Sequence, residues 1–324
     1  MSRVIRKLFW YLLLSPLLLP TVIAQPPNSR LTTSNSYLER GAKWGEKGDW
    51  ERALADYDLA VAADPTNPLA FYNRGVAWYR KGQFDEALTD FNRTLQLKPS
   101  LLEAWMHRSN IALLQGNYEA ALRDCNQAIQ LNPRSAEAWF NRGSVRFVRG
   151  DLKEALVDLN QAIKLNPKLP GVHGHRGAIK FDLHDYDGAL ADYTQEIRLN
   201  PNDAKAWSDR GAAHAVKGDW DGALQDCNQA LKLNPNLAKA WFNHAAMWHA
   251  KGDWEREIED YNRCLANDPK FAVAYAQRGL CRLRQGKDAE AQADFDECLR
   301  LNPKLKDSLQ AEIRKVKALR TNNR

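Results

Sequence analysis

Proline recurs at a fixed interval of 34 residues along most of this chain. The recurring residues are Pro65, Pro99, Pro133, Pro167, Pro201, Pro235, Pro269 and Pro303. A constant interval without insertions indicates one unit copied end to end, and a 34-residue period is typical of stacked helical hairpins. The sequence therefore predicts eight repeats, at residues 34–67, 68–101, 102–135, 136–169, 170–203, 204–237, 238–271 and 272–305.

The repeats agree at positions that would bring two helices together, when each repeat is numbered 1 to 34 with its proline at 32. Position 4 is a large aromatic residue in seven repeats, position 8 is glycine in six and position 20 is alanine in seven. Residues four apart share one face of a helix, so the ring and the glycine form one packing face. The small residues at positions 8 and 20 let two helices approach closely.

Position 15, which is glycine in seven repeats, marks the end of a first helix. Glycine readily adopts the left-handed conformation that ends a helix. The Asp, Asn or Gln that usually follows it, such as Asp49 or Asn117, can cap a second helix at its start. That second helix ends before the recurring proline, because the residue before a proline is disfavoured in the α conformation. Each repeat is thus predicted to hold a helix A and a helix B.

This pattern resembles the tetratricopeptide repeat family, with its aromatic residue at position 4, Gly at 8, Ala at 20, aromatic residue at 24 and Pro at 32, over residues 34–305 of 324. The resemblance implies an all-α fold, a right-handed α-α superhelix. Residues 306–320 continue as an amphipathic segment, with Leu309, Ile313 and Val316 along one side. We expect this C-terminal segment, residues 306–324 with its tail, to cap the exposed face of the last repeat.

One part of the pattern departs from the commonest family version: position 7 is arginine in seven repeats and position 23 is aspartate in all eight. Arginine forks suit carboxylates at half-buried contacts. We therefore expect structural ion pairs between helix A and helix B, within a repeat or between neighbours. In repeats 2 to 4 the residues are Arg74 and Asp90, Arg108 and Asp124, and Arg142 and Asp158. The alternative is a ladder of arginines for acidic ligands.

Positions 2, 5, 9, 12 and 13 fall on the face of helix A that turns away from the packing face, and they vary between repeats. The family resemblance places a concave peptide-binding groove there. Asparagines at positions 6 and 9 can both donate to and accept from a peptide backbone. The candidate groove residues are Leu69, Tyr72, Asn73, Val76, Tyr79, Met106, Asn110, Leu113, Phe140, Asn141, Phe147, Phe181, Phe242 and Asn243. The alternative is that the aromatic residues only pack one helix A on the next.

The family's carboxylate clamp is not expected here, because its cationic positions hold Met106, Gly171 and His175. The predicted function is a non-enzymatic scaffold that binds a protein or peptide segment in the groove. The alternative is a regulatory or assembly subunit of an envelope complex that uses its convex or edge surface. Neither hypothesis involves a cofactor.

The N-terminus has the pattern of a secretory signal, with basic residues before an uncharged stretch from Leu8 to Ala24. We expect a signal peptide at residues 1–24, a flexible leader at 25–33, and an exported protein that is periplasmic, secreted or lumenal. An uncleaved anchor is the alternative, but the stretch is short for a span. Removing the signal would lower the net charge from +6 to +3. So small an excess of basic residues is not typical of a nucleic-acid-binding protein.

No motif in the chain indicates catalysis or metal binding. His173 and His175 are two residues apart, so on a helix they point in different directions. The five cysteines fall at positions where other repeats carry packing residues, which predicts buried thiols, although Cys281 could pair with Cys264 or Cys298.

Repeat 5 is predicted to be the least stable repeat. Gly171 and Gly174 are expected in its helix A, and His184 replaces the capping glycine. Glu196 stands at a close-packed position and would need a partner such as Arg210.

Overall fold

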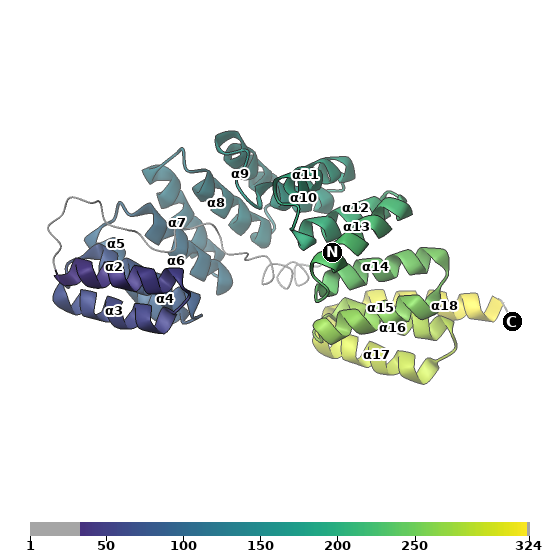
Figure 1. Cartoon of the computed structure of the whole chain (residues 1–324). Helices are drawn as coiled ribbons and strands as arrows, with labels where there is room; N and C mark the ends of the chain where they lie inside the picture. Colours follow the sequence, from purple (N-terminus) through teal and green to yellow (C-terminus); the bar gives the residue numbers. More distant parts are fainter. Residues whose placement is uncertain (1–32, 323–324) are drawn as a thin grey trace. The chain divides into compact units, whose positions relative to one another are not determined.

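The computed structural model describes residues 33–322, and within this range it contains seventeen α-helices and no strand (Figure 1). The chain divides into two compact units, residues 1–172 and 173–324. The predicted signal and all but the last residue of the predicted leader lie outside the described residues. Thr33, which was expected in the leader, is the first residue of α2.

The N-terminal unit contains four helical hairpins. Its helices are α2 (Thr33–Glu46), α3 (Trp50–Ala63), α4 (Pro68–Arg80), α5 (Phe84–Leu97), α6 (Leu102–Leu114), α7 (Tyr118–Leu131), α8 (Ala136–Arg149) and α9 (Leu152–Leu165). Each even-numbered helix packs on the helix that follows it, and each hairpin packs on the next. The predicted A and B helices of repeats 1 to 4 are therefore present.

The C-terminal unit continues the same pattern and ends with one extra helix. Its helices are α10 (Val172–Asp182), α11 (Tyr186–Leu199), α12 (Ala204–Val216), α13 (Trp220–Leu233), α14 (Ala238–Lys251), α15 (Trp254–Asn267), α16 (Ala272–Arg284), α17 (Asp288–Leu301), the 3-10 turn η1 (Pro303–Leu305) and α18 (Lys306–Asn322). Helix α18 packs on α16.

The turns between helix A and helix B follow the predicted capping chemistry. The glycine at position 15 has a positive φ in seven repeats, for example 76° at Gly48 and 82° at Gly286. The residue after it often caps helix B: Asp49 accepts a hydrogen bond from the backbone N–H of Arg52, and Asn117 accepts one from Ala120. Each bond satisfies a backbone donor that the start of a helix leaves unpaired.

Small residues allow the two helices of a repeat to touch. A Cβ added to Gly279 of α16 would lie 2.5 Å from Cε1 of Phe295 in α17, so no larger residue fits without movement.

The recurring tryptophan and proline also meet. The indole Nε1 of Trp105 donates to the carbonyl of Pro99 at 2.8 Å, and Trp139 makes the same bond to Pro133 at 2.9 Å. This bond fixes the entry of helix A against the turn that precedes it.

The predicted ion pairs are confirmed. Arg74 binds Asp90 at 2.7 Å, and the equivalent pairs Arg108–Asp124 and Arg142–Asp158 measure 2.7 Å and 2.8 Å. The three carboxylates are buried. In repeat 7, where position 7 is not arginine, His244 Nδ1 lies 2.6 Å from Asp260. These pairs join helix A to helix B within one repeat, as one of the two arrangements expected from the sequence.

The same arginines also join neighbouring repeats. Nη1 of Arg74 donates to Asp58 at 2.8 Å, and Nη1 of Arg108 donates to Asn92 at 2.7 Å. Asp58 and Asn92 both stand at position 25 of the preceding repeat. Each guanidinium therefore uses two nitrogens inside its own repeat and the third across the junction.

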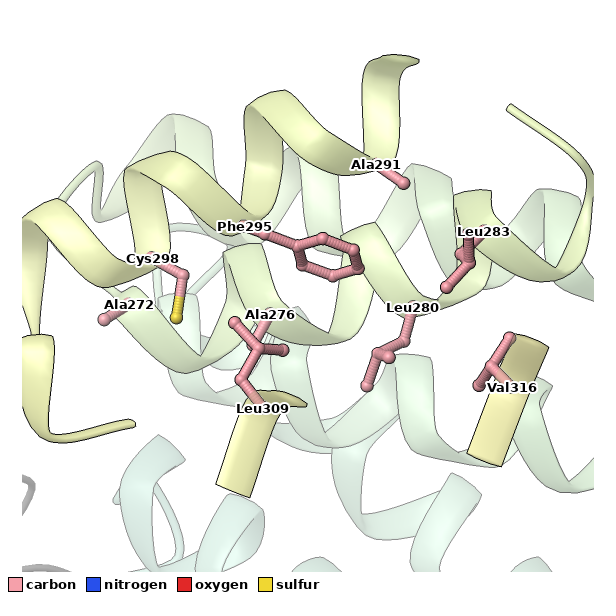
Figure 2. Close-up of a cluster of buried hydrophobic side chains, with 9 residues drawn as sticks. All are labelled: Ala272, Ala276, Leu280, Leu283, Ala291, Phe295, Cys298, Leu309 and Val316. Atoms are coloured by element: carbon pink, nitrogen blue, oxygen red, sulfur yellow. The ribbon is translucent and has the colours of Figure 1, made fainter. Parts of the chain in front are cut away.

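The last helix covers the end of the C-terminal unit, as expected. Leu309 and Val316 of α18 are buried in a cluster with Ala276, Leu280 and Phe295 (Figure 2). The opposite side of α18 is polar and exposed. The helix is also held by the ion pair between Arg320 and Asp288, at 2.5 Å.

Repeat 5 departs from the others in the ways that its sequence indicates, with two corrections. His184 is the only described non-glycine residue with a positive φ, 64°. Gly171 was expected inside helix A, but it has φ 80° and precedes α10, which starts at Val172. Arg210, expected as a partner of buried Glu196, instead binds Asp226, and Glu196 accepts from the backbone N–H of Gly174 at 3.1 Å.

The five cysteines are free and buried, as expected from their positions. Burial raises the pKa of the Cys125 and Cys264 thiols to about 12, so both stay protonated at neutral pH. None of the helices in residues 33–322 is both long enough and apolar enough to cross a membrane.

Candidate binding face of helices α4, α6 and α8

The candidate groove residues of repeats 2 to 4 lie on the A helices α4, α6 and α8, and most are buried. The buried ones, which include Asn243 of repeat 7, are Tyr72, Asn73, Val76, Met106, Asn110, Leu113, Phe140, Asn141, Phe147 and Asn243. Leu69, Tyr79, Phe181 and Phe242 are partly buried. The side chains of this set therefore present little apolar area to solvent.

Two of the tyrosines pack helix α4 on helix α6. The ring of His107, in α6, lies 5.8 Å from that of Tyr72 and 5.4 Å from that of Tyr79 between centroids. On its other side it stacks on Phe91 of α5 at 5.1 Å. Tyr72 and Tyr79 thus have the packing role that the sequence left open beside ligand binding.

His107 is a buried polar ring in an aromatic setting. Within residues 33–322 neither of its nitrogens has a hydrogen-bond partner. Burial, and next the positive charge of Arg80, lowers the pKa of His107 to about 3. The imidazole is therefore neutral at physiological pH, with one nitrogen that can donate and one that can accept.

Two asparagines of the same face have amide groups that the described residues leave unused. The Nδ2 atoms of Asn110 in α6 and Asn141 in α8 are buried and lack a hydrogen-bond partner in residues 33–322. Helices α6 and α8 pack directly on each other. A buried donor without a partner costs about 1–3 kcal/mol, so a hydrogen-bond acceptor brought to this face would relieve that cost.

The candidates in the C-terminal unit are engaged within the protein. Asn243 Nδ2 donates to both the carbonyl and the hydroxyl oxygen of Ser208, each at 3.0 Å. The ring of Phe242 packs on Phe271, with 5.0 Å between centroids, and Phe181 packs on Tyr186 at 5.3 Å.

Arg80 belongs to the same face and was not singled out from the sequence. It is the last residue of α4, and its Nε atom is buried without a hydrogen-bond partner in the described part of the chain. The only sequence signal was its place at position 13, one of the variable positions of helix A. The described residues contain no group of three or more His, Cys, Asp or Glu side chains that could hold a metal ion.

Sequence models of one family match this chain in four places. Models described as tetratricopeptide repeat match residues 45–101, 108–180, 204–237 and 272–305. The last two matches have the same bounds as repeats 6 and 8. Among curated proteins, none matches this sequence.

Solved structures share the fold. A tetratricopeptide repeat protein from Parabacteroides merdae is 20% identical, with a TM-score of 0.62, over 77% of this chain and 98% of that one. PilF of Pseudomonas aeruginosa is 18% identical, with a TM-score of 0.59, over 68% of this chain and 97% of that one.

A third similar structure is larger than this chain. The match is to the Cut9–Hcn1 hetero-tetramer of the APC/C, at 16% identity and a TM-score of 0.67, and it covers 89% of this chain and 57% of that one. At these identities the likeness shows the fold alone. The paired helices, the Arg–Asp ion pairs between them and the four family matches together establish that this chain belongs to the tetratricopeptide repeat family, with multiple tandem repeats.

Proposed function

We propose that this protein is a non-enzymatic scaffold that binds an extended segment of a partner protein on the face formed by α4, α6 and α8. The family consists of protein-interaction modules that are typically without catalytic activity, so a protein partner is the starting expectation. The proposal goes further by naming the face. It rests on one observation, the two buried amide nitrogens of Asn110 and Asn141 that have no partner in residues 33–322.

An unpaired buried donor is costly for the folded protein to keep. Two such donors on adjacent helices would together cost several kcal/mol in the absence of a ligand, by about 1–3 kcal/mol each. Backbone carbonyl groups of an extended peptide are acceptors that recur along the chain. A segment lying across α6 and α8 could therefore pair with both asparagines whatever its side chains are.

The test uses the full chain and peptides selected for binding to it. Random dodecapeptides are selected on the immobilised protein, and dissociation constants of the selected peptides are measured by fluorescence anisotropy. In the double variant Asn110→Ala/Asn141→Ala we expect binding to weaken at least 10-fold, since two hydrogen bonds are lost. Asn243→Ala, which alters the same residue type in the C-terminal unit, is the matched control and should retain binding.

Two outcomes would contradict this assignment. If no peptide is enriched on the protein, binding of an extended segment fails as a function. If the selected peptides bind the double variant as tightly as the original protein, the contact surface lies elsewhere, as in the alternative of an assembly subunit that uses its convex or edge surface.

We also propose that the protein is exported. The support is the sequence pattern of residues 1–24 alone, with a basic start, an uncharged stretch and Ala24 before the expected cleavage point. Mass spectrometry of the protein purified from its native cells should find Gln25 as the first residue. A chain that retains residues 1–24 and sediments with membranes would instead support the uncleaved anchor.

A further inference from the structure

Arg80 differs from the other arginines of helices α4 and α8 because its charge is not paired with a carboxylate in the described part of the chain. Arg74, Arg142, Arg146 and Arg149 each form an ion pair with an aspartate or glutamate. Arg80 is in none of the ion pairs found among residues 33–322, and its Nε atom is buried without a partner. The partly buried face of α4 and α6 therefore carries a positive charge that no described carboxylate neutralises.

Arg80 lies close enough to the aromatic cluster to influence it. After burial, its charge is the second cause that lowers the pKa of His107. Burial raises the pKa of Tyr79, and the charge of Arg80 opposes that rise. Electrostatic effects of this kind require proximity, so the guanidinium and the ring of His107 belong to one neighbourhood.

The unpaired atoms of this face are almost all donors. The Nε of Arg80 and the Nδ2 atoms of Asn110 and Asn141 can only donate. The neutral ring of His107 adds one donor and one acceptor. A ligand that matches this set must bring acceptors, and one of them should carry a negative charge, because a guanidinium in a half-buried place attracts an anion more strongly than it would in water.

We propose that the partner segment is acidic and that the carboxylate of an Asp or Glu side chain binds Arg80. The backbone carbonyls next to that acidic residue would then accept from Asn110 and Asn141. This inference rests on the function proposed above and narrows the class of partner. Arg80 stands at position 13 of repeat 2, so the proposed site differs from the cationic positions of the family's clamp, which are Met106, Gly171 and His175 here.

One described carboxylate acts on the same aromatic cluster as Arg80. Glu103, at the start of α6, is a secondary cause, after burial, of the raised pKa of Tyr72. It forms no ion pair with Arg80 and is partly exposed, so water can screen its charge. Replacing it offers a way to strengthen the site: Glu103→Gln should tighten binding of acidic peptides.

The experiment compares matched peptides on the full chain. Each dodecapeptide enriched in the selection is synthesised with an amidated C-terminus, and again with every Asp and Glu changed to Asn and Gln. Amidation removes the terminal carboxylate as a possible source of the anion. We expect Asp or Glu to be enriched in the selected pool and the uncharged analogues to bind about 10- to 100-fold more weakly, as the loss of a hydrogen bond to a charged group implies.

The variant Arg80→Gln should remove that preference. Acidic peptides and their uncharged analogues should then bind with the same affinity. The affinity should also depend less on salt between roughly 0.05 M and 0.5 M NaCl, a range over which screening of charges changes from weak to strong. Arg284→Gln is the matched control, because Arg284 is also partly buried with an unpartnered nitrogen, but it lies on α16. Circular dichroism verifies that both variants are folded.

The outcomes separate the two proposals. Enriched peptides without any acidic preference, or an acidic preference that survives in Arg80→Gln, would overturn the inference and leave the proposed function standing. Binding that depends on the free C-terminus instead of a side chain would also overturn it. A selection that enriches nothing would reject the proposed function itself.

Discussion

Two asparagines at the same repeat position, one in each unit, have opposite surroundings. Asn141 of repeat 4 and Asn243 of repeat 7 both stand at position 6 of helix A. Asn243 donates to Ser208 of the preceding repeat, whereas Nδ2 of Asn141 has no partner in residues 33–322. The counterpart of Ser208, at position 5 of repeat 3, is Met106. A thioether is only a weak acceptor, so the neighbour cannot satisfy the amide.

The difference shows what a repeat determines and what it leaves to its neighbour. Position 6 places a polar side chain at the contact between consecutive A helices in both units. The residue at position 5 of the preceding repeat then decides whether that group holds two helices together. The amide of Asn243 is used for structure, whereas the Nδ2 atom of Asn141 is left without a partner in residues 33–322, which is why we assign binding to the N-terminal unit.

The largest expected effect concerns position 7, where the two units should behave alike. Arg74→Met and Arg210→Met each leave a buried aspartate, Asp90 or Asp226, without its main cation. Removing one partner of a buried ion pair typically costs about 3–5 kcal/mol. Urea denaturation followed by circular dichroism should show a comparable loss for both variants. A clear loss in one unit only would mean that the units differ in more than position 6.

The next effect is a change in acid sensitivity at His107. Its pKa is near 3 in the folded protein, while an unfolded histidine has a value of about 6.5. The unfolded state therefore binds the proton first, and the free energy of unfolding falls as pH decreases from about 6.5 towards 3. At pH 4 this amounts to about 3 kcal/mol.

The variant His107→Leu should lose that contribution, because leucine does not titrate. Its free energy of unfolding, measured from pH 7 to pH 4, should decline less than that of the original protein, with the difference appearing below pH 6.5. Identical pH profiles would mean that His107 is not held neutral by its surroundings.

A smaller effect tests the opening comparison directly. Asn243→Ala removes two hydrogen bonds and should lower the free energy of unfolding by about 1–2 kcal/mol. Asn141→Ala removes an amide nitrogen that has no partner in the described residues. The relief of that unpaired donor offsets the lost packing of the side chain, so stability should change little. Thermal denaturation of the two variants provides the measurement. An equal loss of stability in both would refute the distinction between the two asparagines.

The smallest expected effect is local opening of α10 in repeat 5. This helix has 11 residues where α8 has 14, contains Gly174, and ends near His184 in a left-handed conformation. Glycine inside a helix costs about 1 kcal/mol against alanine, and a left-handed residue with a Cβ costs about 1–2 kcal/mol. Hydrogen exchange with mass spectrometry should find α10 the first internal helix to lose amide protection. Uniform protection from repeat 2 to repeat 7 would count against this.

The fold was predictable from the sequence because the same residue pattern occurs in eight repeats, so a signal seen in one repeat can be checked in the others. Eight aspartates at position 23 opposite seven arginines at position 7 leave few arrangements other than a contact between helix A and helix B. The glycines at position 15 and the caps that follow depend only on local chemistry. Such features need no knowledge of how one repeat sits on another.

The rest of the candidate face depends on contacts between repeats, which spacing alone does not give. Three hydrogen bonds depend on where a side chain lies relative to a second helix. They are the bonds from Arg108 to Asn92, from Asn243 to Ser208 and from the backbone N–H of Gly174 to Glu196. Arg80 stands out only in the structure, where every other arginine of helices α4 and α8 forms an ion pair. The burial of Tyr72 and Val76 likewise follows from packing between helices α4, α5 and α6.

Arg108 and Arg142 each use a third guanidinium nitrogen to bind an asparagine at position 25 of the preceding repeat, so these two junctions carry the same contact. If repeat 3 were excised, Arg142 would meet Asn92 where it now meets Asn126, and one asparagine would replace another of the same kind. For this arginine, loss of repeat 3 would therefore leave the contact across the junction unchanged in kind. The contact of Arg142 with the preceding repeat would thus survive the deletion of these 34 residues.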